Sequence, residues 1–197
     1  MTSDASVLRE MTDGGLLQAA AAGDAAAFAE IVNRHYQPVY RLVWRMTGGG
    51  SDCEDIAQEA FVKLWQNPAQ LREGGALKGW LMRVASNAVI DRSRKPKYAD
   101  LDTAPEVSDP QARPDAPLDR GQAARLIDSR ISALPERQRL ALSLVYFEGL
   151  SNIDAAAVMD VSVEAVESLL ARARRSLKDS LSAEWRELLA GVAETGR

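Results

Sequence analysis

The chain has 197 residues, of which 46% are hydrophobic and 26% charged, and its 24 Lys and Arg against 28 Asp and Glu leave a net charge of −4. This composition is too apolar for a wholly disordered chain, and the length suits one domain of usual size or two small ones. One cysteine and one histidine exclude an internal disulfide and a metal site built on two histidines, while the lack of a long apolar run and of a secretory signal predicts a cytoplasmic protein without membrane insertion.

Apolar residues at helical spacing predict two helices at the start of the chain. A short helix around Leu16 ends at Gly23, and Asp24 is placed to cap a longer one that continues to Met46. Pro38 lies inside this longer pattern and predicts a kink or a break just before it. The glycines at 48–50 then end the helix.

Two further helices follow the glycine run. Ser51 or Asp52 is placed to cap the first, whose opening turn is acidic where the helix dipole favours acids, and its apolar stripe continues to Trp65. The second runs from about Leu77 to Ser93 and turns these apolar residues inward: Trp80, Leu81, Val84, Ala88 and Val89.

A proline-rich stretch divides the sequence. Five of the eight prolines lie between residues 96 and 117, and residues 96–118 carry two basic and five acidic side chains with few large apolar ones. Such a segment cannot bury a face and predicts an extended linker. We therefore expect an N-terminal domain over residues 1–95, a linker over residues 96–118 and a C-terminal domain over residues 119–197.

The second half predicts a further series of helices. One is expected near residues 119–134, and its continuation from Pro135 to a stop at Gly149 has an apolar side formed by Leu140, Leu144, Val145 and Phe147. Ser151 caps a short helix over residues 152–159, and Ser162 caps a last long helix that ends at about Leu181. No sustained period-two alternation occurs, so the predicted fold class is all-α, with two small helical domains.

The short and long helices over residues 152–181, joined by a turn at Asp160 and Val161, have the pattern of a helix-turn-helix. Ala156 is small where two such helices must cross, and Val161 can pack against Val166 at the start of the second helix. Basic residues gather in the second half of that helix: Arg172, Arg174, Arg175 and Lys178. They suit phosphates and base edges, although any pair of antiparallel helices can carry small residues and a basic surface.

The helix that begins near Asp52 carries an acidic, hydrogen-bonding face opposite its apolar stripe. Four residues lie on that face at spacings of three and four: Asp52, Asp55, Gln58 and Glu59. A metal site, a solvated surface and a docking surface for a basic protein all fit this spacing. The spacing alone favours the solvated surface.

The helix over residues 79–95 combines apolar and aromatic residues with an exposed amide at Asn87 and basic residues at its end. Basic side chains beside exposed amides and aromatics suit single-stranded nucleic acid. The helix dipole alone also favours basic residues in a last turn, and Trp80 is more simply explained as a core residue than as a stacking platform.

Nothing in the sequence indicates an enzyme. His35 has no nucleophile near it in the sequence, and the G-x-S-x-G turn of many hydrolases does not occur. We therefore expect no catalytic residue, no cofactor and no bound metal.

Taken in this order, the segments resemble bacterial sigma factors of the extracytoplasmic-function (ECF) type, in the sigma-70 superfamily. The resemblance runs from about Leu16 to Leu181 and rests on four matches followed by the helix-turn-helix. The matches are HYQPVYRL (35–42), DCEDIAQEAFVKLW (52–65), WLMRVASNAVID (80–91) and LPERQRLALSLVYFEGLS (134–151).

The resemblance implies a promoter-specificity subunit that binds core RNA polymerase, directs transcription initiation and is controlled by an anti-sigma factor. The family's contact helix for the clamp helices of the polymerase β′ subunit matches Asp52, Asp55, Gln58 and Glu59. The part that opens and reads the minus-ten promoter element matches the segment that carries Arg72, Lys78, Asn87, Arg92 and Arg94. The resemblance assigns recognition of the minus-thirty-five element to Ser168, Arg172 and Arg175, the last as a phosphate contact.

The chain departs from the family in the predicted recognition helix. Glu167 and Leu169 stand where relatives commonly carry basic residues, and Asp160 stands at a turn where glycine is common. Glu167 would repel a phosphate or accept a hydrogen bond from a cytosine amine, which leaves the minus-thirty-five sequence open. Residues 182–197 extend past the family core and carry apolar residues at helical spacing.

Two other functions fit parts of the pattern. A stand-alone helix-turn-helix repressor with a ligand-binding N-terminal domain predicts DNA binding without polymerase. A protein-binding adaptor, similar to an anti-sigma factor, predicts that Arg172, Arg174 and Arg175 are ordinary surface residues.

Overall fold

The computed structural model describes residues 5–68, 71, 77–94 and 127–194. Within these residues every regular element is a helix, which confirms the all-α prediction. The elements are α1 (Ala5–Glu10), α2 (Asp13–Ala21), α3 (Ala25–Thr47), α4 (Cys53–Gln66), α5 (Leu77–Arg94), α7 (Glu136–Leu142), η3 (Ser143–Phe147), α8 (Asn152–Met159) and α9 (Val163–Glu194). The linker predicted over residues 96–118 and the start of the helix predicted near residue 119 lie outside the described residues.

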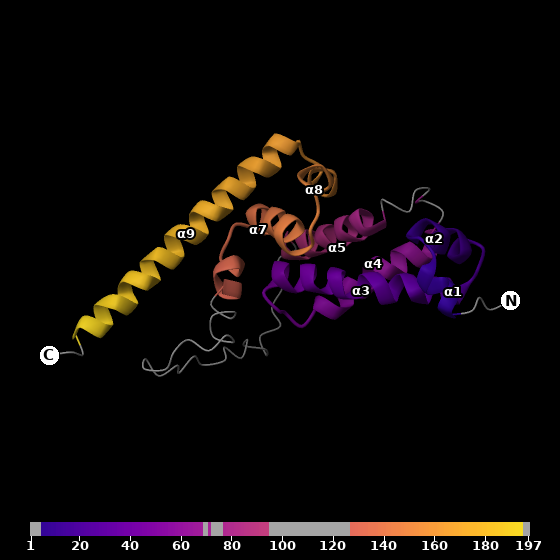
Figure 1. Cartoon of the computed structure of the whole chain (residues 1–197), viewed down its shortest axis with the longest axis horizontal. Helices are drawn as coiled ribbons and strands as arrows, with labels where there is room; N and C mark the ends of the chain where they lie inside the picture. The colour runs from indigo at the N-terminus through magenta and orange to yellow at the C-terminus, as the bar shows by residue number, and fades with distance from the viewer. Residues whose placement is uncertain (1–4, 69–70, 72–76, 95–126, 195–197) are drawn as a thin grey trace.

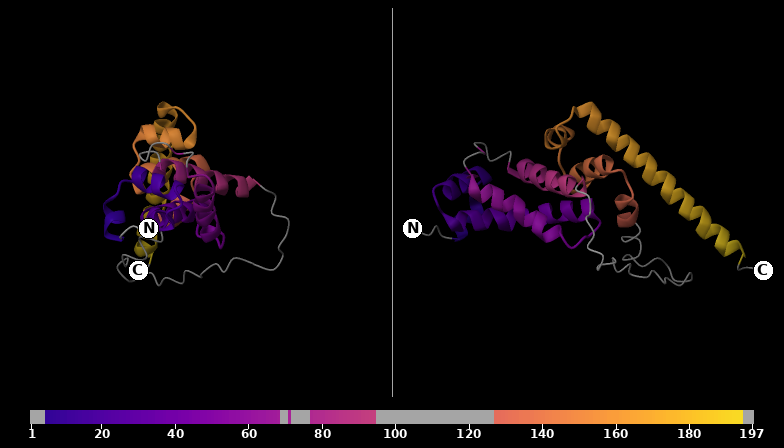
Figure 2. Two further views of the ribbon diagram at one scale, coloured as in Figure 1. Left: turned by 90° about the vertical axis from the view of Figure 1, so that its right-hand side faces the viewer. Right: turned by 180° about the vertical axis from the view of Figure 1, so that it is seen from behind.

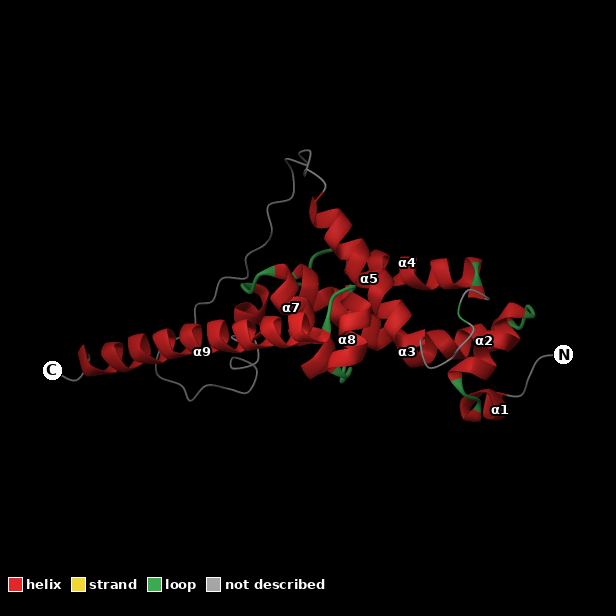
Figure 3. Ribbon diagram, turned by 90° about the horizontal axis from the view of Figure 1, so that it is seen from above, coloured by secondary structure: helices red, strands yellow, loops and turns green. Residues whose placement is uncertain are grey.

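The helices form an elongated molecule, with α1 and α2 at one end and α9 projecting from the other (Figure 1). α3 packs against α2, α4 and α5, while α9 packs on α7 and α8. The two groups of helices meet where α8 lies on α5 and where α7 and η3 lie on α3. The views from behind and from above show the same arrangement, with the far end of α9 extending away from the other helices (Figures 2 and 3). Among the described residues, no helix is both long and apolar enough to cross a lipid bilayer.

Both ends of α3 lie where the sequence places them. The Oδ1 atom of Asp24 accepts hydrogen bonds from the backbone N–H groups of Ala26 and Ala27, at 2.9 and 3.3 Å. At the other end, Gly48 adopts a left-handed conformation with φ 75°, and its N–H donates to the carbonyl of Trp44. These local signals need only the residues within one turn, which is why the sequence predicts them.

Of the kink or break expected before Pro38, the break does not occur, because α3 continues through that residue. A kink there stays a prediction. The proline has no N–H to donate to the carbonyl of Arg34, so the helix loses one hydrogen bond there. Residues on both sides, including Ile31 and Val39, are fully buried against the neighbouring helices. Tertiary packing therefore keeps the helix whole despite the lost bond.

α4 begins directly after Asp52, but no side chain caps its first turn. Ser51 instead donates a hydrogen bond to Asp52 Oδ1 over 3.2 Å, so the predicted side-chain cap is wrong. The apolar stripe of α4 is buried as far as Leu64, whereas Trp65, expected at its end, is exposed. Cys53 is also buried, and its Sγ lies 3.0 Å from Thr47 Oγ1. This thiol is a packing residue.

The single helix expected from Pro135 to Gly149 is divided into α7 and the π-helical segment η3. In η3 the backbone bonds span five residues, as in the hydrogen bond from Glu148 N–H to the Ser143 carbonyl. The wider turn shifts the side chains around the helix axis. As a result Phe147, expected on the apolar side, is 40% exposed, while Glu148 is buried.

α8 and α9 form the predicted helix-turn-helix. Ser151 Oγ accepts a hydrogen bond from Asp154 N–H at 3.1 Å, and Asp160 makes the turn with φ 54°. Aspartate is one of the few residues other than glycine that adopts this conformation at modest cost, which explains the missing glycine. α9 runs to Glu194, well past the end expected near Leu181.

Candidate functional site

The predicted acidic face lies along the exposed side of α4. Asp52, Asp55 and Gln58 are exposed, and the side chain of Glu59 is 39% exposed. The opposite side of α4 is buried against α3 and α5. The face is therefore open to a partner, and among the described residues no group of His, Cys, Asp and Glu is arranged to hold a metal ion.

Tyr36 of α3 lies near Gln58 and Glu54 of α4, and both of these residues influence its pKa. Burial is the main cause that raises the pKa of Tyr36, followed by the charge of Glu54 on α4. The tyrosine ring packs near Phe61, with 6.0 Å between ring centroids. Tyr36, from the sequence match at 35–42, thus packs beside the helix that carries the acidic face.

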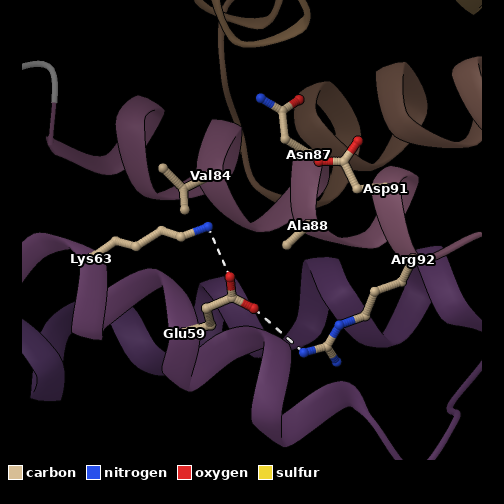
Figure 4. Close-up of a pocket in the computed structure, with 7 residues that line it drawn as sticks. All are labelled: Glu59, Lys63, Val84, Asn87, Ala88, Asp91 and Arg92. Atoms are coloured by element: carbon tan, nitrogen blue, oxygen red, sulfur yellow. Dashed lines mark hydrogen bonds and ion pairs between the residues drawn. The ribbon is translucent and has the colours of Figure 1, made fainter. Parts of the chain in front are cut away.

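A small ion-pair network connects the acidic face of α4 to the end of α5 (Figure 4). Glu59 Oε1 lies 2.8 Å from Lys63 Nζ on the same helix, and Glu59 Oε2 lies 3.4 Å from Arg92 Nη2 on α5. Arg92 Nη1 also lies 3.9 Å from Asp52 Oδ2. The structure therefore brings together two groups of residues that the sequence assigns to different partners.

A cavity of about 410 Å³ lies between α4 and α5 beside this network. Its lining residues are Glu59, Lys63, Val84, Asn87, Ala88, Asp91 and Arg92. Asn87 is exposed, as predicted, and its amide projects from α5 on the same side as the Asp91 carboxylate (Figure 4). The cavity is lined by hydrogen-bond donors and acceptors, and by the apolar side chains of Val84 and Ala88.

The residues predicted for the minus-ten element are not gathered in one place. Lys78 lies at the first turn of α5, whereas Arg92 and Arg94 lie in its last turn, about 21 Å further along the helix axis. Lys78 Nζ donates to the backbone carbonyl of Glu148 and lines a second cavity, of about 420 Å³, between α5 and α8. Arg94 is exposed, and Arg72 lies outside the described residues.

Trp80, interpreted from the sequence as a core residue, is half-buried and lines this second cavity. It packs against the hydrophobic core while part of its ring faces the cavity. The core interpretation is therefore confirmed in part.

The residues predicted for the minus-thirty-five element lie together on one exposed side of α9. Arg172 Nη2 donates to Ser168 Oγ at 2.8 Å, one turn away, and Arg175 is exposed close to one turn further on. The opposite side holds Val166 and Ala173, which are fully buried against the rest of the helix-turn-helix. The first four turns of α9 thus present the Ser168 hydroxyl and the Arg172 and Arg175 guanidinium groups on an exposed side.

The start of α9 is also acidic. Ser162 Oγ accepts a hydrogen bond from Ala165 N–H at 3.2 Å. Hydrogen bonds from its own backbone N–H and from Ser162 hold the pKa of Glu164 below its usual value. A negative charge here is favoured by the helix dipole.

Sequence reasoning missed Glu148, whose side chain is 1% exposed and contacts Arg41 and Arg45 of α3. No local signal marks it, because a glutamate before a helix-ending glycine is usually solvated. Its burial depends on the contact between η3 and α3, which are far apart in the sequence.

Comparisons with known proteins agree with this geometry. The family Sigma-70 region 2 matches residues 31–97, which include α4 and α5, and Sigma-70 region 4 matches residues 124–177, which include the helix-turn-helix. A solved structure of CnrH in complex with the cytosolic domain of CnrY is 28% identical, covers 87% of this chain and 97% of its own, and superimposes with a TM-score of 0.64.

Curated relatives extend over most of the chain. ECF RNA polymerase sigma factor SigW of Bacillus subtilis is 32% identical over 171 residues, which cover 81% of this chain and 91% of the relative. ECF RNA polymerase sigma-E factor of Escherichia coli is 30% identical over 187 residues, which cover 87% of this chain and 95% of the relative. The chain therefore belongs to the ECF sigma factors of the sigma-70 family, which are not enzymes but subunits that direct promoter recognition in transcription initiation.

Proposed function

We propose that the exposed face of α4 docks on the clamp helices of the polymerase β′ subunit. The observation that carries this proposal is the exposure of Asp52, Asp55 and Gln58 on a helix whose other side is fully packed. Acidic and amide groups held on a rigid helix can steer and orient a basic coiled coil. The choice of polymerase as the partner rests on membership of the sigma factor family, and the choice of α4 as the contact rests on its exposed face.

The end of α5 and the cavity beside it read the minus-ten element on a separated strand. Opening DNA costs a few kcal/mol per unstacked base, so an extruded base needs a pocket and its phosphates need cations. The amide of Asn87 can bond to a base edge at the mouth of the 410 Å³ cavity, and Arg92 and Arg94 can meet the phosphates. Lys78 and Arg72 belong to the same proposed set, at the other end of α5 and in the segment before it.

α9 reads the minus-thirty-five element in the major groove. Ser168 and Arg172 lie on the same side of the helix, which suits base edges, while Arg175 follows at a position suited to a phosphate. Glu164 and Glu167, which are exposed on the first turns, restrict which base pairs this helix tolerates.

An anti-sigma factor controls the protein in this proposal. The support is the structural relative CnrH, which was solved in complex with the cytosolic domain of CnrY and resembles this chain over nearly its whole length. Exposed apolar side chains on both halves, including Val62, Trp65 and Ile153, offer surface to such a partner.

Transcription in vitro tests the promoter function. Core RNA polymerase is incubated with a supercoiled library of promoters from the host, with and without this protein. We expect initiation at a defined set of start sites only when the protein is present. Binding of promoter duplex by the protein alone, with no initiation from the complete mixture, would support the repressor alternative instead.

A further inference from the structure

Glu148 is a charged residue buried between the two halves of the molecule. Its side chain, at the end of η3, is 1% exposed, and its carboxylate oxygens meet two arginines of α3. Oε1 lies 3.0 Å from Arg45 Nη1, and Oε2 lies 3.5 Å from Arg41 Nη2. A buried carboxylate is tolerated only where such partners replace water, so this side chain depends on the contact between the halves.

Neighbouring groups complete the contact around Glu148. The guanidinium of Arg45 lies 4.0 Å from the ring centroid of Phe147, which covers it on one side. Lys78 Nζ, from α5, donates to the Glu148 backbone carbonyl. Three cationic side chains of the region 2 helices thus converge on one residue of the region 4 helices.

Further polar and close contacts join the same two halves. Ser93 Oγ, near the end of α5, donates to Glu136 Oε1 of α7 at 3.1 Å. α8 also packs on α5, where a Cβ at Gly79 would make an ordinary van der Waals contact with Val158 Cγ2, at 3.8 Å. The pairing of Glu148 with Arg41 and Arg45 is thus one of several contacts that join the two halves.

This closed arrangement is too short for a promoter. Elements at minus ten and minus thirty-five are about 25 base pairs apart, which is roughly 85 Å along the duplex at about 3.4 Å per base pair. α5 and α8 are in direct contact, and the reading helix α9 follows α8 after a short turn. The chain between residues 94 and 127 can span up to about 110 Å when extended, so its length permits the halves to separate by the required distance.

We propose that Glu148 is a latch that holds the free protein closed, and that its release from Arg41 and Arg45 precedes promoter engagement. The inference rests on the proposed reading of two promoter elements by α5 and α9. Release is feasible because all three charged groups regain water when the halves part, which offsets the lost pairing. Release also frees Lys78, a residue proposed for the minus-ten element, from the Glu148 carbonyl.

Solution scattering on the full chain tests the latch directly. Glu148→Gln keeps the shape of the side chain but removes its charge, leaving Arg41 and Arg45 without a counter-ion in the closed form. We expect a larger radius of gyration and a second, longer distance maximum. Arg45→Gln attacks the same pair from the other half and should open the molecule in the same way, whereas Glu10→Gln, an exposed change on α1, should leave the scattering unaltered.

A cross-linking rate measures the size of the effect. Ser93→Cys and Glu136→Cys in a Cys53→Ala background place two thiols across the interface, where the native side chains lie 3.1 Å apart. Adding Glu148→Gln should slow intramolecular disulfide formation by about tenfold. Circular dichroism checks that the variants keep the helix content of the parent chain. If Glu148→Gln does not fold, the same measurements are made on Arg45→Gln. Scattering and cross-linking that match the parent chain in both variants would overturn the latch.

Transcription separates this inference from the proposed function. If the latch limits activity, Glu148→Gln should shorten the lag before initiation with core polymerase while leaving the start sites unchanged. An open variant with an unchanged lag would overturn the regulatory role. Loss of initiation in the parent chain as well, together with clear opening by scattering, would overturn the proposed promoter reading but leave the latch intact.

Discussion

Arg92 of α5 is paired with Glu59 of α4, with 3.4 Å between Nη2 and Oε2. The arginine belongs to the proposed minus-ten surface and the glutamate to the proposed polymerase-docking surface. A phosphate that draws Arg92 away would break this pair, whereas Lys63 Nζ lies 2.8 Å from Glu59 Oε1 on the same helix. The proposed polymerase-docking surface and the proposed minus-ten surface therefore share this ion pair.

Removing the polar groups of the docking face should weaken polymerase binding without unfolding the protein. Gln58→Ala and Glu59→Ala together should raise the free energy of binding to core polymerase by roughly 1–3 kcal/mol, because two oriented polar contacts are lost. Fluorescence anisotropy with labelled protein measures the affinity. Glu10→Ala is the matched control, and equal affinity for all three chains would remove α4 from the interface.

Replacing Arg172 and replacing Arg175 should change DNA binding in different ways. Arg172→Ala should cost about 1–3 kcal/mol at the cognate upstream element and relax selectivity at the base that it reads. Arg175→Ala should weaken binding to all sequences alike and lower the salt dependence by about one counter-ion. Holoenzyme affinities for matched and mutated promoters, measured over a salt series, separate the two roles. Identical selectivity and salt slopes in both variants would contradict the assignment.

The turn between α3 and α4 needs glycine at residue 49. Gly49 has φ 85°, and a Cβ there would lie 2.9 Å from Trp44 Nε1. Gly49→Ala should lower the free energy of unfolding by about 1–2 kcal/mol, from backbone strain and this clash. Urea denaturation measures the change.

Gly50 supplies the control for that substitution within the same turn. A Cβ at Gly50 would meet nothing nearer than Thr47 Cβ, at 4.0 Å. Gly50→Ala should therefore change the free energy of unfolding by less than about 0.5 kcal/mol. Equal losses for both substitutions would show that the turn is not specified by residue 49.

Acid should weaken the start of α9 through Glu164. Its pKa is lowered in the folded protein, so the carboxylate stabilises the helix above the usual glutamate pKa and this stabilisation is lost as the pH falls through the lowered value. Glu164→Gln should destabilise the protein at neutral pH, and its difference from the parent chain should vanish in acid.

A direct titration of Glu164 by NMR gives a second measurement. In the Ser162→Ala chain its pKa should move back toward the usual value, because one of the hydrogen bonds that lower it is absent. A titration that is the same in the parent and the Ser162→Ala chain would exclude this contact as a cause.

Local signals in the sequence determined most helix ends and the exposed side of α9. Asp24, Gly48 and Ser151 act within one turn of their own helices, so neighbours in the chain are sufficient to predict them. The exposed side of α9 follows from helical periodicity in the same way, because Val166 must face inward and Arg172 then faces outward.

Tertiary structure decided what depends on residues that are far apart in the chain. α3 continues through Pro38 because neighbouring helices cover both sides of it, and the register of η3 follows its own wide turn rather than the apolar pattern. The burial of Glu148 requires Arg41 and Arg45, about a hundred residues away. Desolvation and ion pairing act through space. The sequence alone therefore determined the position of each charged group along the chain, and only the packing of the helices decided which of these groups form ion pairs.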